Sequence, residues 1–315
     1  MRVGINSIRF NNPTALIKVL KKIKNFNVEI IGTDVQELGY SAASLLSTSY
    51  FQAPSLTEEQ EYFNFLTHLC VEKSIDILIP GSDSDVYFLG KYKDKIPSII
   101  ITPEINIIEK LNDKLNASLE MSELGVKTPK ILNNLVGEKK IIFRKRISSS
   151  STGIYVVDLT SESYIKNYFN SDYFIQRLVK GDEYTVDVFA DKNGNPKLII
   201  PRKRLEVKAG MSICSQLIKH QSIINACKMI YSKYYIPGLS NVQFIDDGEN
   251  IYFIEINLRF AGSGISSILG SFNYLEEYLN HYVNNISLKT LDYYMNLVAW
   301  NSIITRYYTE VIYKS

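Results

Sequence analysis

The chain has 315 residues, a formal net charge of +2, 45% hydrophobic residues and 22% charged residues. This length allows two or three compact units, and the composition argues against a disordered chain. The near-neutral charge gives no reason to expect a nucleic-acid or membrane partner, and no apolar run reaches the roughly 18 residues that a membrane helix needs. Three separated cysteines suggest neither a disulfide framework nor a zinc site, and favour a cytoplasmic location.

The amino-terminal third alternates strands and helices. Strands are expected at 2–7, 28–33 and 76–80, with helices at 13–24 and 58–73. This alternation predicts a parallel sheet with helices on both faces, a Rossmann-like unit. Asp34 follows the second strand, where a dinucleotide-binding acid would lie. The first turn, however, has the single glycine Gly4 in place of GxGxxG, which argues against NAD or FAD.

Two loops of this unit are candidates for substrate binding. The turn 6–12 leads into a helix amino terminus, where backbone amides and Arg9 would hold a carboxylate. The segment GSDSD, 81–85, follows a strand at the edge where open α/β sheets bind ligands. Ordinary helix capping by Asp83 and Ser84 is the alternative for this segment.

The middle of the chain shows helical spacing over 105–124, followed by two strands joined by the serine-rich stretch 148–151. Taken alone, this stretch is typical of a solvated hairpin turn. Further on, Glu183, Thr185 and Asp187 share one strand face opposite apolar neighbours. A half-buried polar wall is therefore expected there, in which Asp187 would be structural.

The carboxyl-terminal half reads as paired strands with helices between them. An Asn-Gly turn at 193–194 predicts a hairpin. The basic residues that follow at 202–204 form either a surface patch or part of a site. The remaining expected elements are a helix at 222–234, a hairpin with strands at 240–245 and from 251, a helix at 273–282 and a closing strand region at 297–313.

The strongest chemical signal is the stretch IYFIEINLRFAGSG, 251–264. A period of two places Phe253, Glu255, Asn257 and Arg259 on one strand face and an apolar row on the other. Charged groups on a central strand are costly unless they are paired or bind a metal. A glutamate and an asparagine two residues apart offer hard oxygen ligands, which suit Mg²⁺, and an arginine beyond them would hold an anion. An exposed surface strand is the alternative.

This stretch resembles the metal-binding strand of the ATP-grasp superfamily, close to the carbamoyl-phosphate-synthase-like branch of carboxylate-amine ligases. The segments NDKLNASLEMSELGVKTPK, IIFRKRISSSSTG and YFIQRLVKGDEYTVDVF resemble further family motifs, so the resemblance covers nearly the whole chain. It implies an α/β fold with a Rossmann-like preATP-grasp domain followed by a two-subdomain α+β ATP-grasp module. The expected limits are 1–104 for the first domain, 105–178 for the lid subdomain and 179–315 for the carboxyl-terminal subdomain with the metal site.

The resemblance also implies which residues bind the phosphates of ATP. Lys114 occupies the position of the family's phosphate-binding lysine, and Arg144 occupies the lysine position of its phosphate lid. Serines replace most of the lid glycines, and the predicted phosphate contacts there are Ser149, Ser150 and Ser151. Serine restricts the backbone but offers a hydroxyl donor, and arginine keeps the positive charge, so phosphate binding is expected to survive.

The adenosine contacts follow from the next motif. The resemblance implies that the backbone of Arg177 and Val179 meets the adenine edge, with Gln176 as a side-chain partner. It places Glu183 on the ribose hydroxyls. The family often has glutamate at the position of Gln176, and glutamine keeps an acceptor there.

The resemblance adds a third metal ligand and the catalytic arginines. The implied ligands for Mg²⁺, with Mn²⁺ as an acceptable substitute, are Gln243, Glu255 and Asn257. Arg259, together with Arg202 or Arg204, would hold the acyl phosphate. These two arginines are preferred to Lys203 because they share a strand face.

The implied activity is an ATP-dependent carboxylate-amine ligase that forms an amide through an acyl phosphate and releases ADP and phosphate, in small-molecule or peptide biosynthesis. Its partners would be a small-molecule carboxylate and an amine, and a homodimer is compatible because many relatives are dimers. Two alternatives stay open. One is a phosphotransferase without an amine acceptor, and the other is a nucleotide-binding regulatory protein with weak turnover, which the missing lid glycines suggest.

Overall fold

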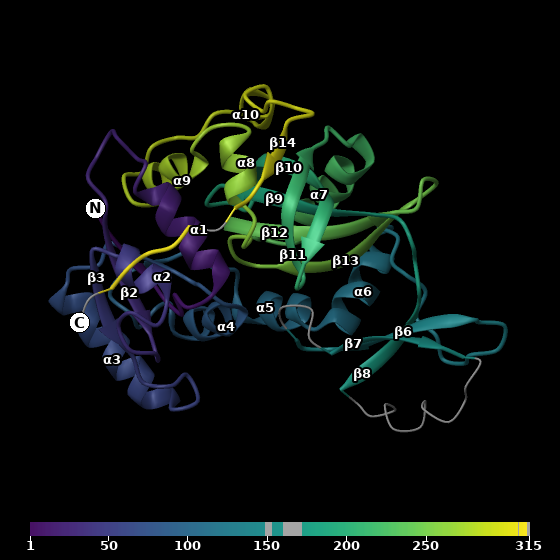
Figure 1. Cartoon of the computed structure of the whole chain (residues 1–315), viewed down its shortest axis with the longest axis horizontal. Helices are drawn as coiled ribbons and strands as arrows, with labels where there is room; N and C mark the ends of the chain where they lie inside the picture. The colour runs from purple at the N-terminus through teal and green to yellow at the C-terminus, as the bar shows by residue number, and fades with distance from the viewer. Residues whose placement is uncertain (149–152, 160–171, 308, 314–315) are drawn as a thin grey trace.

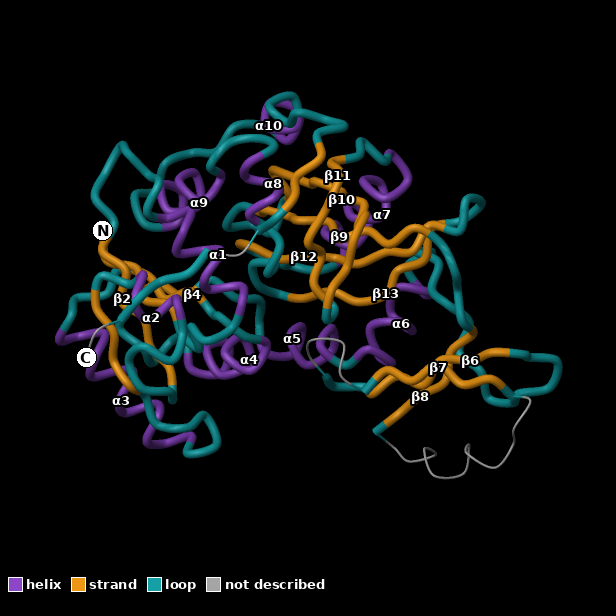
Figure 2. The backbone as a smooth tube through the Cα atoms, in the orientation of Figure 1, coloured by secondary structure: helices purple, strands orange, loops and turns teal. Residues whose placement is uncertain are grey.

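The computed structural model describes residues 1–148, 153–159, 172–307 and 309–313. Three sheets organise this part of the chain (Figure 1): a five-stranded sheet in the amino-terminal third, a three-stranded sheet, and a six-stranded sheet that holds most of the carboxyl-terminal half. The three-stranded sheet lies at the opposite end of the molecule from the amino-terminal domain (Figure 2). No helix in the described ranges has the length and apolar character needed to span a membrane.

The amino-terminal domain is the predicted Rossmann-like unit. Its strands pair in parallel in the order β3-β2-β1-β4-β5. The strands are β1 Arg2–Ile5, β2 Glu29–Asp34, β3 Ser49–Gln52, β4 Ile77–Ile79 and β5 Ile99–Ile100, and the helices are α1 Asn11–Leu20, α2 Ala42–Leu46, α3 Glu59–Glu72 and α4 Asp83–Tyr92. The prediction missed β3 and β5, because both are short edge strands without fully buried residues.

The helix predicted at 105–124 is two helices, α5 Ile105–Asn112 and α6 Lys114–Glu123. The break falls at Asp113, whose backbone is extended, with φ −78° and ψ 110°. Its carboxylate caps α6 by accepting hydrogen bonds from the amides of Leu115 and Asn116. The first residue of α6, Lys114, thereby takes a buried position at the edge of the central cavity.

The three-stranded sheet is antiparallel, in the order β7-β6-β8, and packs over its own small apolar cluster. Its strands are β6 Lys140–Lys145, β7 Ile154–Asp158 and β8 Tyr173–Arg177. The predicted phosphate contacts Ser149, Ser150 and Ser151 lie between β6 and β7, outside the described residues.

The six-stranded sheet is antiparallel, in the order β13-β12-β9-β10-β11-β14. Its strands are β9 Asp182–Ala190, β10 Pro196–Lys208, β11 Met211–Leu217, β12 Gly238–Asp246, β13 Ile251–Asn257 and β14 Ile303–Thr305. The helices of this half are α7 Gln221–Lys233, α8 Ile265–Leu269, α9 Tyr274–Tyr282 and α10 Leu291–Met295. The closing strand region predicted at 297–313 reduces to β14.

One apolar core joins the amino-terminal domain to the six-stranded sheet. It includes Leu16 of α1, Val186 of β9 and Leu279 of α9. The predicted domain limits fall in connections, at residue 104 just before α5 and at residue 178 just after β8. We propose them as the limits of the three units.

The predicted alternation along β13 is wrong at Phe253. Gln243 pairs with Glu255 and Phe244 pairs with Phe253, which leaves Ile254 as an extra residue in a β-bulge. Phe253 therefore turns into the core and packs against the ring of Phe244. Ile254 and Glu255 both line the cavity instead.

Candidate active site

A cavity of about 740 Å³ is lined by loops of the amino-terminal domain, by β6 to β8 and by the strands from β9 to β13. This volume lies in the upper part of the range of about 300–1,000 Å³ that is usual for ligand sites. Every predicted site residue within the described ranges lines this cavity except Arg202. Ser148, which precedes the undescribed serines, lines it too.

Glu255 stands between two cationic side chains. Its Oε2 lies 3.7 Å from Nζ of Lys114 and 3.4 Å from a terminal nitrogen of Arg144. Lys114 also donates to the backbone oxygen of Ser148 at 2.6 Å. Burial lowers the pKa of the Arg144 guanidinium, and the charge of Glu255 acts in the opposite direction. Two cations around one carboxylate make a suitable site for phosphate groups and a metal ion.

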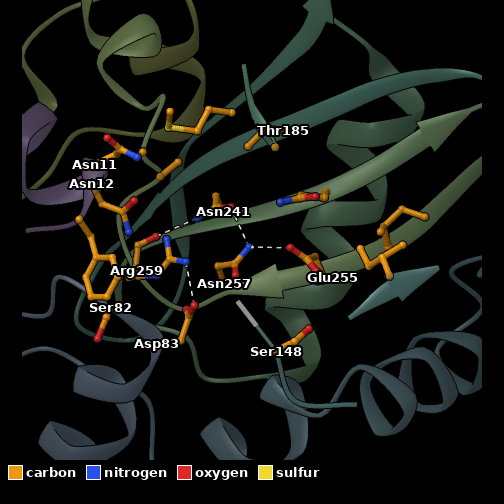
Figure 3. A pocket seen from close by; sticks show the side chains of 18 of the residues that line it. Asn11, Asn12, Ser82, Asp83, Ser148, Thr185, Asn241, Glu255, Asn257 and Arg259 are labelled. Atoms are coloured by element: carbon orange, nitrogen blue, oxygen red, sulfur yellow. Dashed lines mark hydrogen bonds and ion pairs between the residues drawn. The ribbon is translucent and has the colours of Figure 1, made fainter. Parts of the chain in front are cut away.

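The three predicted metal ligands come together on β12 and β13. Gln243 lies directly opposite Glu255 in the strand pair, and Asn257 follows two residues later. Nδ2 of Asn257 donates to Oδ1 of Asn241 at 3.1 Å and to Oε1 of Glu255 at 3.4 Å (Figure 3). Its amide oxygen is therefore the atom left for a metal.

This ligand set fits Mg²⁺ only in part. It contains one carboxylate and two amide oxygens, and no group of three His, Cys, Asp or Glu side chains suited to a metal occurs within the described residues. Mg²⁺ takes six oxygen ligands and usually shares them between carboxylates and substrate phosphates. The donor set therefore suits Mg²⁺ bound together with a nucleotide better than Mg²⁺ alone.

The predicted adenine hinge joins β8 to β9. The side chain of Arg177 bonds Glu138 at 2.6 Å, and its backbone N–H donates to the carbonyl of Lys130 at 2.8 Å. Only the carbonyl of Arg177 is then left for a ligand. The Gln176 amide is fully buried and already hydrogen-bonded. Its oxygen accepts from Arg144, and its nitrogen donates to the Pro129 carbonyl. Its role as an adenine partner stays a prediction, and in this structure it holds Arg144.

Glu183 and Arg204 form an ion pair at the cavity wall. A terminal nitrogen of Arg204 donates to Oε2 of Glu183 at 2.8 Å, and the other donates to the carbonyl of Gly210 at 2.7 Å. Burial lowers the pKa of the Arg204 guanidinium, whereas Glu183 raises it. Both residues are predicted members of the site, and both side chains line the cavity.

The structure contradicts the prediction that Arg202 touches the acyl phosphate. Its side chain is 0% exposed and does not line the cavity. Two of its nitrogens donate to the carboxylate of Asp187, at 2.6 and 3.0 Å, and a third donates to Ser263 at 3.0 Å. Strand alternation correctly places Arg202 and Arg204 on the same face of β10. It cannot reveal that Asp187, on the neighbouring strand β9, binds the guanidinium of Arg202.

One end of the cavity, where the sequence predicts substrate binding, lies at the amino-terminal domain. The guanidinium of Arg9 bonds Asp34 at 2.9 Å and stacks over the Phe10 ring at 4.9 Å. The guanidinium of Arg259 bonds Asp83 at 2.8 Å. Arg9 lines the cavity, and its binding of a substrate carboxylate stays a prediction.

Sequence reasoning includes Asp83 in the candidate segment 81–85 but misses Asn241 at this end. The capping alternative for Asp83 is wrong, because Ser82 is the cap of α4 and Asp83 faces Arg259. Asn241, which bonds Asn257 and the carbonyl of Arg259, was not considered. Its position two residues before Gln243, on the same face of β12, was the available signal.

Comparisons with known proteins concern the fold of this chain. Residues 170–295 match a protein-family model described as ATP-grasp in the biosynthetic pathway with Ter operon. The fold is similar to that of N5-carboxyaminoimidazole synthetase from Staphylococcus aureus complexed with ADP, with a TM-score of 0.71 and 15% identity over 92% of this chain and 78% of that one. A sequence search among curated proteins gave no match.

Two further solved structures share the fold. One is the biotin carboxylase domain of 2-oxoglutarate carboxylase from Hydrogenobacter thermophilus in complex with MgADP, with a TM-score of 0.68 and 15% identity over 96% of this chain and 73% of that one. The other is an L-amino acid ligase from Bacillus licheniformis, with a TM-score of 0.68 and 14% identity over 90% and 74%. These likenesses confirm the predicted α/β fold.

Proposed function

We propose that this chain is an ATP-grasp enzyme, an ATP-dependent ligase that joins a carboxylic acid to an amine; the family-model match over residues 170–295 and the shared fold support this. One observation carries the proposal: Glu255 lies between Lys114 and Arg144 in a cavity that continues to the charged loops of the amino-terminal domain. Phosphate-binding and substrate-binding groups thus share one enclosed space.

ATP and Mg²⁺ are the proposed cofactors. When bound by Gln243, Glu255 and Asn257, Mg²⁺ would supply charge neutralisation at the β- and γ-phosphates. Lys114 and Arg144 hold the phosphates. The carbonyl of Arg177 and the amide of Val179 meet adenine, and Glu183 binds the ribose hydroxyls.

The proposed reaction has two steps. A carboxylate oxygen attacks the γ-phosphorus, and ADP leaves from an acyl phosphate. The amine nitrogen then attacks the acyl carbon, phosphate leaves and the nitrogen loses a proton. Arg204 and Arg259, which both line the cavity, balance the negative charge of the acyl phosphate and of the tetrahedral oxyanion. No residue of the chain needs to act as a nucleophile.

Hydroxylamine trapping tests this proposal. Hydroxylamine is an amine nucleophile that converts acyl phosphates to hydroxamates, so it replaces the unknown amine. With ATP, Mg²⁺ and a pool of small carboxylic and amino acids, we expect ADP and hydroxamate in equal amounts. Formation of AMP would mean adenylation and would contradict the proposal. ADP formed without hydroxamate would indicate the phosphotransferase. The homodimer and the cytoplasmic location stay predictions.

A further inference from the structure

The substrate end of the cavity presents a charge pair that binds neither the nucleotide nor the metal in the proposed function. Arg259 follows the metal ligands along the chain, and Asp83 is the first residue of α4 in the amino-terminal domain. Their side chains, 13% and 19% exposed, meet at 2.8 Å. Figure 3 shows Arg259 pointing at Asp83 beside Asn257 and Asn241.

Both members of the pair keep unused bonding capacity. Asp83 bonds Arg259 through Oδ2, and Oδ1 has no donor among the described residues. Nε of Arg259 is buried and lacks an acceptor in that same part of the chain, and one terminal nitrogen makes only a long bond, 3.4 Å, to the Phe260 carbonyl. Buried charged groups with unused donors or acceptors are costly. A ligand that brings both an anion and a cation would satisfy the two residues together.

We propose that the carboxylic acid substrate is an α-amino acid, with its carboxylate on Arg259 and its ammonium on Asp83. This inference rests on the ligase function proposed above and names its acyl substrate. The ammonium and carboxylate of an α-amino acid are attached to neighbouring atoms, which matches an arginine and an aspartate in direct contact. A simple carboxylic acid would bring no donor to Oδ1 of Asp83, and a second anionic group placed there would be repelled.

The Arg9–Asp34 pair, which also lies on the amino-terminal domain, does not serve the ammonium equally well. Both oxygens of Asp34 are already occupied, by the backbone and side chain of Arg9 and by the amide of Gln36. Asp34 therefore fixes Arg9 in place, whereas Asp83 has an oxygen to offer. Arg9 is left to contact the part of the amino acid that extends away from the metal.

Ammonium binding at Asp83 also decides which substrate supplies the acyl group. A carboxylate beside an ammonium stabilises its protonated form. A protonated amine has no lone pair. The amino acid bound at this site therefore cannot be the nucleophile that attacks the acyl phosphate of another amino acid. It is the acyl donor, and the nucleophilic amine comes from the second substrate.

A comparison of two matched pools tests the inference. One pool contains α-amino acids, and the other contains the corresponding 2-hydroxy acids, in which a hydroxyl replaces the ammonium. With ATP, Mg²⁺ and hydroxylamine, we expect kcat/KM for ADP release to be at least about 50-fold higher for the amino acids, as for a charge-assisted hydrogen bond. Equal use of both pools overturns the inference.

A variant identifies the residue. Asp83→Asn should reduce the preference for amino acids to below about fivefold, because the uncharged amide no longer selects an ammonium. Asp94→Asn changes an exposed acid just beyond the same helix and should leave the preference unchanged. A preserved preference in Asp83→Asn overturns the assignment. If that variant fails to fold, Asp83→Glu keeps the charge and should keep the preference.

A binding measurement separates this inference from the ligase proposal. If no acid supports ADP release, the apparent Tm of the unmodified protein is measured with Mg²⁺, a non-hydrolysable ATP analogue and each pool. Stabilisation by the amino acids alone supports the inference even though the ligase proposal fails. Equal stabilisation by both pools, or none by the amino acids, overturns it.

Discussion

Glu255 is the central carboxylate of the proposed phosphate and metal site. It is the one ionised group among the three proposed metal ligands, and it contacts both Lys114 and Arg144. The substitution Glu255→Gln keeps the shape of the side chain and removes its charge. We expect kcat for ADP formation to fall about a thousandfold or more, a scale typical of lost transition-state charge stabilisation.

Two measurements accompany that variant. The apparent Tm should stay within a few degrees, because Arg144 keeps its bonds to Gln176 and to the Ile254 carbonyl. Glu249→Gln is the matched control, since Glu249 lies exposed on the turn of the same hairpin. Near-normal ADP release by Glu255→Gln would exclude Glu255 from the catalytic site.

Asp85 is a buried acid beneath the substrate loops. Burial raises its pKa from 3.8 to about 6, against the opposing effect of hydrogen bonds from Ser82 and Ser7. Between about pH 4 and pH 6, the Asp85 carboxyl therefore keeps its proton in the folded state, whereas it has lost that proton in the unfolded state. The contribution of Asp85 to the free energy of unfolding is fully present below about pH 4 and is lost as the pH rises through about 6.

Asp85→Asn removes this pH dependence. The difference in pKa of about 2 corresponds to about 3 kcal/mol of unfolding free energy. The apparent Tm of the unmodified protein, relative to that of the variant, should thus fall between pH 4 and pH 7. A constant difference over this range would contradict the assignment.

At the scale of elements, the loops after β1 and β4 build the substrate end together. The first loop carries Arg9 and the second leads into α4 at Asp83. The two loops touch at Gly81, where a Cβ atom would lie 2.0 Å from the backbone oxygen of Asn6. Alanine at Gly81 must push the two loops apart. Overpacking of this kind costs about 1–3 kcal/mol.

Gly81→Ala should therefore lower the apparent Tm and raise the KM for the acid about tenfold or more, with the KM for ATP nearly unchanged. Gly137→Ala is a useful control, because the space around Gly137 is open and only its positive φ, 81°, is strained. Equal effects on the two KM values would show that the loops do not form a separate substrate site.

Several elements were predictable because their signals are local. Alternation places Glu255 and Asn257 on one face of β13, and the short turn before β13 predicts its hairpin with β12. The bulge at Ile254, the break at Asp113 and the burial of Arg202 were not predictable in this way. Each depends on contacts with a neighbouring strand or loop, which a pattern within one segment does not encode.

At the scale of the molecule, the cavity is formed by all three sheets, so that the proposed nucleotide and substrate ends are contiguous.

The proposed metal ligands carry a single negative charge. We expect Mg²⁺ alone to change the apparent Tm by less than about 1 °C, whereas Mg²⁺ with ATP at about 100 times its Kd adds about 2.7 kcal/mol, or roughly 5 °C. Stabilisation by Mg²⁺ alone equal to that by both would contradict the shared site. Mn²⁺ should replace Mg²⁺ in this measurement.

The most direct test of the ligase function is the release of ADP, AMP and phosphate from ATP and Mg²⁺. It is measured with pooled amino acids and small carboxylic acids, in the presence and absence of pooled amines. We predict that ADP and phosphate form in equal amounts and depend on both pools, because the acyl phosphate needs an acid to form and an amine to turn over. AMP in place of ADP, or ADP release that ignores both pools, would contradict an ATP-grasp ligase.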